Sequence, residues 1–170
     1  MLKKKRHPVI LTLNILFFFV VILFHYTNTF NLKIYTATPM LILPLLVSFS
    51  LFTSISKAAA VGLFSGIFMD SVASGSRSFN ALILMLIAAF VCVASNNLFN
   101  KNIQSAVVLS LICCIFYFVV YWIVFHTFSK ELESSLAYLL KYALPSAVYS
   151  AAFIFPFYYI YKHFNKIKSE

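Results

Sequence analysis

Hydrophobic residues occur along the chain in six long runs that short polar stretches separate. Most of the runs approach the roughly 20 residues that an α-helix needs to cross a membrane. The predicted spans cover residues 8–26, 34–52, 58–73, 79–94, 106–125 and 136–160. This pattern predicts an all-α, polytopic membrane protein with about six transmembrane helices and a single membrane domain over residues 1–170.

Three of the runs have features that affect this prediction. The first follows a basic start but is longer than the apolar part of a signal peptide, so we expect a retained helix. The second contains Pro39 and Pro44, which should kink it or place its first turn near the interface. Runs 58–73 and 79–94 are short, so a re-entrant hairpin stays an alternative to two full spans.

Composition agrees with the membrane class. The chain is 62% hydrophobic and 10% charged, which is more apolar than a soluble domain with a surface to solvate. The chain has thirteen Lys and Arg residues and four Asp and Glu residues, which gives a net charge of +9. The basic residues cluster near both ends of the chain, as in cytoplasmic membrane flanks, so we expect membrane lipids and no nucleic acid as partners.

The positions of the basic residues also predict an orientation. If the odd-numbered connections lie outside, the inside set outnumbers the outside set, which places both termini in the cytoplasm. The inside set is Lys3, Lys4, Lys5, Arg6, Lys57, Lys101, Lys162, Lys166 and Lys168, against Lys33, Arg77 and Lys130 outside.

Cysteines and tyrosines are predicted to serve the membrane fold. Cys92, Cys113 and Cys114 lie inside apolar runs and are interpreted as small packing residues, with no metal-binding pattern. Tyrosines gather at the ends of runs, where interfacial anchoring is the expected role. They are Tyr26, Tyr35, Tyr138, Tyr158, Tyr159 and Tyr161.

One stretch, "GLFSGIFMDSVASGSRSFNAL", holds all three glycines and the only aspartate of the chain. Ala58, Gly62, Gly66 and Asp70 recur every four residues and so form one ridge on an α-helix. Small residues at this spacing let a neighbouring helix approach closely in a membrane. A carboxyl group in hydrocarbon costs at least ~2.5 kcal/mol unless it faces protein or water. The ridge therefore predicts a tightly packed helix pair.

The turn after this helix centres near Gly75, so Asn80 should return to the depth of Asp70. We predict a hydrogen bond between these two side chains across the hairpin. Lys141, near the outer end of the last span, and Arg77, in the turn, are alternative partners. Two simpler interpretations stay open: Lys141 snorkels to the interface, and Asp70 is a span-end residue wetted by headgroups.

Catalytic signatures are missing from the sequence. The other carboxylates, Glu131, Glu133 and Glu170, lie in a predicted loop or at the tail. The zinc motif HExxH, the nucleophile motif GxSxG and a Walker loop are all absent. We therefore expect a protein that is not an enzyme and has no cofactor or metal, although a proton-relay role for Asp70 stays an alternative.

The 21-residue stretch resembles the most recognisable segment of the rod shape-determining protein MreD family. In that family the third span tends to read G-x3-G-x3-D, followed by a Gly-rich turn and an N-A-L or H-A-L opening of the next span. Gly62, Gly66 and Asp70 match the first part, and Asn80-Ala81-Leu82 match the second. Ser74 and Ser78 depart from it, because the family has glycine four and eight residues after the aspartate.

The resemblance implies a noncatalytic scaffold of the bacterial cell-elongation machinery, in the inner membrane, that helps maintain rod shape. Its implied partners are MreC and, through it, MreB and the pair formed by a SEDS glycosyltransferase and a penicillin-binding protein, which carry out lateral peptidoglycan synthesis. The predicted structural or partner-docking residues are Gly62, Gly66, Asp70, Gly75, Asn80 and Lys141. The family fold is similar to that of the transporter S components. The alternative function is accordingly the substrate-binding subunit of an energy-coupling-factor-type vitamin transporter.

Overall fold

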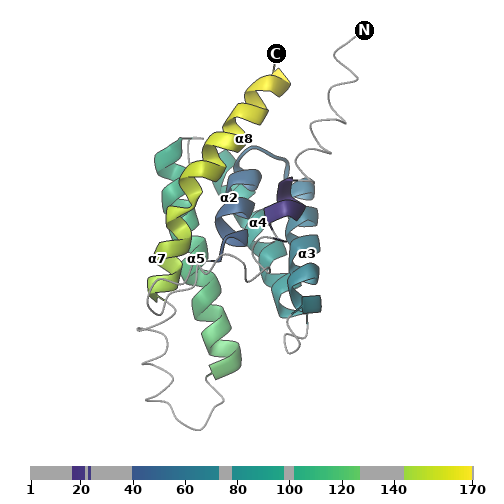
Figure 1. The fold of residues 1–170 in the computed structure, drawn as a ribbon, viewed down its shortest axis with the longest axis vertical. Helices are drawn as coiled ribbons and strands as arrows, with labels where there is room; N and C mark the ends of the chain where they lie inside the picture. Colours follow the sequence, from purple (N-terminus) through teal and green to yellow (C-terminus); the bar gives the residue numbers. More distant parts are fainter. Residues whose placement is uncertain are drawn as a thin grey trace.

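The computed structural model describes residues 17–21, 23, 40–72, 78–97, 102–126 and 144–169. Within these ranges every regular element is an α-helix, which confirms the predicted all-α class for this part of the chain (Figure 1). The helices are α2 (Ile42–Leu51), α3 (Ile55–Val72), α4 (Phe79–Asn97), α5 (Ile103–His126), α7 (Leu144–Ala152) and α8 (Ile154–Ser169).

Three of the described helices are long and apolar enough to cross a membrane: α3, α4 and α5. At about 1.5 Å per residue their 18, 19 and 24 residues measure roughly 27 to 36 Å, against a hydrocarbon core of about 30 Å. They lie within a few residues of the predicted spans 58–73, 79–94 and 106–125. The chain therefore carries the helices of a membrane protein.

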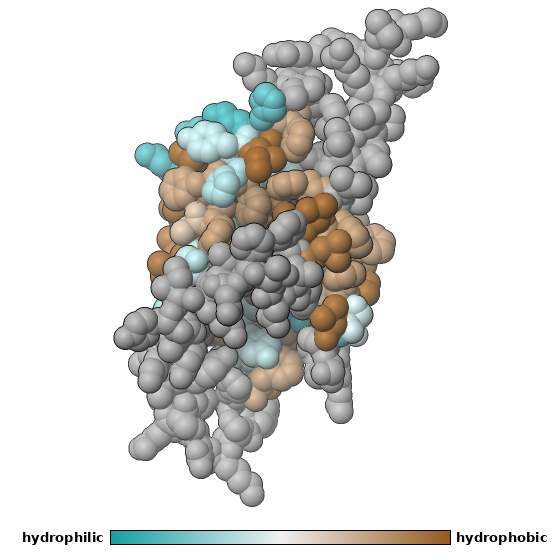
Figure 2. All heavy atoms as spheres, viewed as in Figure 1, coloured by the Kyte–Doolittle hydropathy of each residue, from teal (hydrophilic) through white to brown (hydrophobic). Residues whose placement is uncertain are grey.

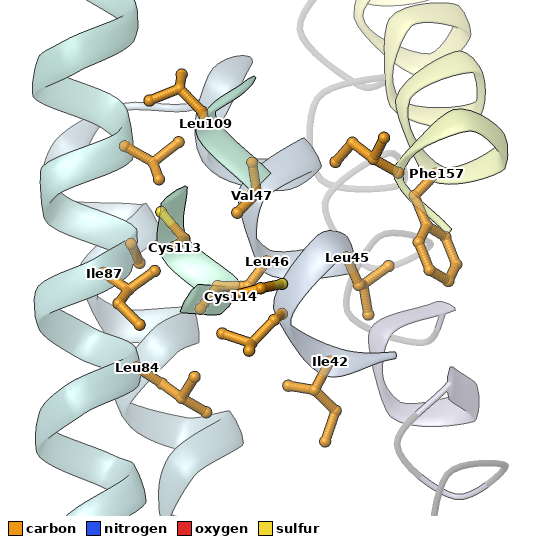
Figure 3. Close-up of a cluster of buried hydrophobic side chains, with 14 of the residues drawn as sticks. Ile42, Leu45, Leu46, Val47, Leu84, Ile87, Leu109, Cys113, Cys114 and Phe157 are labelled. Atoms are coloured by element: carbon orange, nitrogen blue, oxygen red, sulfur yellow. The ribbon is translucent and has the colours of Figure 1, made fainter. Parts of the chain in front are cut away.

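Helix α2 lies at the centre of the described helices. It contacts α3, α4, α5, α7 and α8, and nine of its ten residues are buried. Such a helix is apolar on all sides because every side meets protein. Figure 3 shows its side chains between those of α4, α5 and α8. With ten residues it is about 15 Å long, too short to cross a membrane by itself.

Proline positions fix where two of the helices begin. Pro44 is the third residue of α2, in the first turn, where a missing N–H leaves no intrahelical bond unmade. Pro156 is likewise the third residue of α8. Its ring opposes the carbonyl of Ala152, which is the last residue of α7.

The structure corrects the predicted last run in two respects. The described part of 136–160 is two helices, broken at Phe153, where the N–H donates to the Ser150 carbonyl at 3.1 Å in a tight turn. Helix α8 then continues to Ser169, nine residues beyond the predicted end. Pro156 explains the break, because a continuous helix would need an N–H at that position.

Aromatic side chains join α2 and α8 to the helical segment 17–21. The rings of Phe17 and Tyr161 are 6.1 Å apart, and those of Phe49 and Tyr161 are 5.7 Å apart. Phe52 and Tyr158 are also 5.7 Å apart. Tyr158 and Tyr161 are therefore buried packing residues, and the prediction that they are interfacial anchors is wrong. Sequence position at the end of a run did not reveal that other helices cover them.

The surface of the described helices is strongly apolar around their middle. Phe64 of α3 is 70% exposed, and Leu82 and Phe90 of α4 are 56% and 54% exposed. In Figure 2 many of the coloured residues on the visible face are hydrophobic, and several of the most hydrophilic ones lie near one end. Exposed apolar area of this extent is a liability in water but the normal state of a helix that faces lipid.

The three cysteines confirm their predicted role. Cys92, Cys113 and Cys114 are buried thiols that form no disulfide, and the two cysteines of α5 lie in the core beside α2 (Figure 3). They pack as small apolar residues.

Candidate functional site: a polar contact between three helices

Gly62 and Gly66 bring α3 into backbone contact with α4. A Cβ atom built on Gly62 would lie 2.5 Å from the carbonyl oxygen of Leu84. One built on Gly66 would meet the Asn80 carbonyl oxygen and the Ala81 Cα, and would lie 2.5 Å from the Ala81 amide nitrogen. These obstacles are backbone atoms, which cannot move aside as a flexible side chain can. Glycine is therefore required at both positions for this helix separation.

The close approach places the Asp70 carboxylate at the start of α4. Its Oδ1 accepts hydrogen bonds from the Asn80 side-chain amide at 2.9 Å and from the Asn80 N–H at 3.2 Å. Its Oδ2 accepts one from the Ala81 N–H at 2.9 Å. The predicted hydrogen bond between Asp70 and Asn80 is confirmed. The structure adds two backbone donors that the sequence analysis did not predict.

These two backbone bonds have a clear physical role. Helix α4 begins at Phe79, so the N–H groups of Asn80 and Ala81 belong to the first turn and have no intrahelical acceptor. Asp70 supplies the acceptor, as an N-cap side chain does, although it belongs to a different helix. The positive end of the α4 dipole in turn stabilises the carboxylate. A half-buried charge and an unsatisfied helix end thus compensate each other.

A third helix joins this contact through Tyr117. Its hydroxyl donates to Asn80 Oδ1 at 2.7 Å, and its side chain is buried in α5. Asn80 therefore donates to Asp70 through its side-chain NH2 group and accepts from Tyr117 through its side-chain oxygen, so both groups of the carboxamide are used. We refer to Asp70, Asn80 and Tyr117 as the Asp70 network.

Tyr117 was not among the residues predicted from the sequence, although two signals pointed to it. It lies within the run 106–125, whereas the tyrosines considered as anchors lie at ends of runs. It is also 11 residues after the start of the predicted span 106–125, and Asp70 is 12 residues after the start of the predicted span 58–73. Both distances are about 16 to 18 Å along spans predicted to run in the same direction, so the two residues should share a depth.

Aromatic rings continue the contact beyond the network. Phe79, the first residue of α4, lies with its ring 6.4 Å from that of Tyr117, 5.9 Å from that of Tyr121 and 5.3 Å from that of Phe125. The three α5 residues are four apart and so share one face of the helix. Ring packing at these distances favours one position for the start of α4 on α5.

Ser78, which precedes α4, has an uncommon backbone conformation. Its φ is 56°, in the left-handed region that favours glycine. This is one of the two positions where the sequence departs from the MreD pattern, which has glycine there. Ser78 thus replaces the family's glycine at a position whose left-handed backbone conformation disfavours any residue with a side chain.

The other predicted site residues are not placed with the network. Gly75 and Lys141, and the alternative partner Arg77, lie outside the described residues. Ala58 is buried on α3 on the same ridge as the two glycines. Among the residues that the structure describes, there is no group of three or more His, Cys, Asp or Glu side chains that could hold a metal ion.

Comparison with models of protein families, with curated proteins and with solved structures finds no match to this chain.

The backbone contact at Gly66 leads to a first prediction. Gly66→Ala should destabilise the protein by about 1–3 kcal/mol, because the added methyl group overpacks against α4 backbone, although alanine favours a helix by about 0.5–1 kcal/mol. Labelling of the three buried cysteines by a thiol-reactive fluorophore during heating in mild detergent measures unfolding. Ala60→Val, on an exposed part of the same helix, is the control and should leave the midpoint near that of the wild type. A Gly66→Ala protein as stable as the control would contradict the close approach.

The third helix of the network gives a second prediction. Tyr117→Phe keeps the ring packing but removes the donor to Asn80, and should cost about 0.6–1.5 kcal/mol in the same assay. Tyr159→Phe, at an exposed position of α8, removes a hydroxyl without this contact and is the control. Equal midpoints for the two variants would show that the Tyr117 hydrogen bond adds no stability.

The backbone of Ser78 gives a third prediction. Ser78→Gly should be more stable than Ser78→Ala by about 1 kcal/mol, since both lose the hydroxyl and only glycine adopts the left-handed conformation freely. The order of the two unfolding midpoints tests it. An alanine variant that is more stable than the glycine variant would show that this conformation is not needed.

Proposed function

We propose that this chain is a noncatalytic membrane scaffold of the bacterial cell-elongation machinery. It would act in the inner membrane, where it helps to maintain rod shape and to localise lateral peptidoglycan synthesis. The proposal rests on the resemblance of Gly62–Leu82 to the MreD family and on the way these residues are used. Its implied partners are MreC and, through it, MreB and the pair formed by a SEDS glycosyltransferase and a penicillin-binding protein.

The Asp70 network is the observation that carries the proposal. The aspartate of a catalytic or proton-carrying site needs access to a substrate or a proton path. The Asp70 carboxylate instead accepts two backbone N–H groups of α4 and one side-chain amide. Gly62 and Gly66 are used for close helix approach, and Asp70, Asn80 and Ala81 are used for this contact. Such use supports a role in shaping a rigid surface.

The proposed membrane topology has six spans with both termini in the cytoplasm. Two exposed lysines support this orientation: Lys57 near the start of α3 and Lys162 in α8. In Figure 1 the start of α3 and the end of α8 lie at the same end of the bundle, opposite the last turn of α3. Asp70 lies in that last turn. An excess of basic residues at one end is the usual mark of the cytoplasmic side.

The α3–α4 hairpin is the part that we propose to present to a partner. Its inner face is fixed by the glycine contacts and the Asp70 network. Its outer face carries exposed apolar residues, including Phe64 and Ile67 of α3. A rigid apolar helix surface of this kind suits a partner with a single transmembrane helix, because shape fit rather than a hydrophobic drive governs association in lipid.

The proposal predicts that Asp70→Asn weakens both the hairpin and partner assembly. The variant keeps the shape of the side chain but places an amide donor against N–H donors, at a cost of about 1–2 kcal/mol. In a rod-shaped bacterium that lacks its own MreD, the wild-type chain should restore rod shape and co-purify an MreC-type protein. Asp70→Asn should lower both readouts at equal or reduced protein level.

Glu131→Gln, which neutralises a carboxylate in a predicted loop, is the matched control and should behave as the wild type. The scaffold proposal fails if Asp70→Asn retains abundance, partner co-purification and rod shape together. It also fails if the wild-type protein co-purifies with a small molecule and an ATPase module, as a vitamin-transporter subunit would. Mild-detergent purification followed by mass spectrometry separates these outcomes.

A further inference from the structure

The last turns of α8 leave the helix bundle. Tyr161 is buried, whereas Lys162 and His163 after it are exposed. The helix nevertheless continues to Ser169, so about 12 Å of helix follows Tyr161. Phe164 still packs against the core, and the end of the helix lies past the other helices that the structure describes (Figure 1).

All charged residues of this segment are basic. Lys162, Lys166 and Lys168 lie within α8, and the helix contains no Asp or Glu. Cations near a helix C-terminus are also favoured by the helix dipole, so the helix continues easily despite the repulsion between like charges. The segment is therefore suited to a negatively charged surface.

Contacts within the bundle fix the level at which this basic segment begins. The Lys162 ammonium lies 5.7 Å from the centroid of the Tyr158 ring, a cation–π distance. Tyr158 packs against Phe52, which directly follows α2. Lys57, also exposed, follows a few residues later in α3. Lysines from two helices thus lie at the same end of the bundle, where the helices leave their apolar packing.

Apolar side chains just before the basic segment distinguish between kinds of anionic partner. Phe155 is 49% exposed and Tyr159 is 59% exposed, both on α8. A soluble polyanion would use the lysines and leave these rings in water. An anionic lipid uses both, because its headgroup pairs with lysine and its acyl chains cover the rings.

We propose that the last turns of α8, beginning at Lys162, bind the headgroups of anionic phospholipids. The lysines pair with lipid phosphates, and Tyr159 lies at the boundary between headgroups and acyl chains. This interaction ties the end of α8 to one membrane surface. It does not depend on the scaffold function proposed above.

The test uses the full chain reconstituted into nanodiscs of equal parts phosphatidylglycerol and phosphatidylcholine. Native mass spectrometry after gentle extraction counts the lipids of each kind that stay bound. Each lysine near an anionic surface strengthens binding by about fivefold, so the two lysines exchanged here should together give the wild type about a 25-fold preference for phosphatidylglycerol over phosphatidylcholine. The variant Lys162→Gln/Lys166→Gln should reduce this preference to below about twofold.

Two variants serve as controls. Lys33→Gln/Lys130→Gln removes the same charge elsewhere and should keep the wild-type preference. Lys162→Arg/Lys166→Arg retains the charge and should keep it as well. Thermal labelling of the buried cysteines checks that each variant is folded. A further arm needs no variant: raising the salt from about 0.1 M to about 1 M shortens the Debye length from about 10 Å to about 3 Å and should lower the preference.

Three results would overturn the proposal. The first is a wild-type protein that retains both lipids equally. The second is an equal loss in the glutamine variant and the Lys33/Lys130 control, which would mean that net charge alone governs retention. The third is displacement of phosphatidylglycerol by soluble glycerol phosphate at millimolar concentration, which would show a site for free phosphate.

Discussion

The hydrogen bonds from the start of α4 to the Asp70 carboxylate are the interaction on which the other features of the hairpin depend. A carboxylate in an apolar environment and an uncapped helix end are each costly, and each supplies what the other lacks. The bonds form only if α3 and α4 nearly touch, which requires Gly62 and Gly66. They also fix Asn80 so that its side-chain oxygen, Oδ1, accepts a hydrogen bond from the Tyr117 hydroxyl. Helix separation, helix capping and attachment to α5 are therefore one coupled arrangement.

The short helix α2 meets a different constraint. Its ten residues cannot span a membrane, yet they contact five other helices. Apolar packing on all sides gives α2 its position, and polar contacts contribute at its ends. At its N-terminal side the buried Met40 N–H donates to the Ser150 hydroxyl at 2.8 Å. The described bundle thus combines a packed apolar centre around α2 with a polar contact at the edge formed by α3.

Much of the hairpin could be predicted from the sequence. The four-residue spacing of small residues before Asp70 predicted a close helix pair, and the ten-residue separation from Asn80 predicted their hydrogen bond. The break at Phe153 was not predicted, although Pro156 gives its physical reason. Tyr158 and Tyr161 were assigned to the membrane interface because they lie at the end of an apolar run. Their burial depends on Phe49 and Phe52, which are about 100 residues away in the sequence, and no local pattern reports such a contact.

The sequence by itself determined the class of protein, the apolar helices and the pairing of α3 with α4, because these follow from local periodicity and from residues close in the chain. Only the tertiary structure decided which backbone N–H groups the Asp70 carboxylate binds, that Tyr117 completes the network and that α2 is enclosed. Nearly every residue type has the same backbone N–H group, so the amino-acid sequence does not show which backbone N–H groups a carboxylate on another helix will bind. Their position is set when several helices pack together, and that packing is a property of the whole fold.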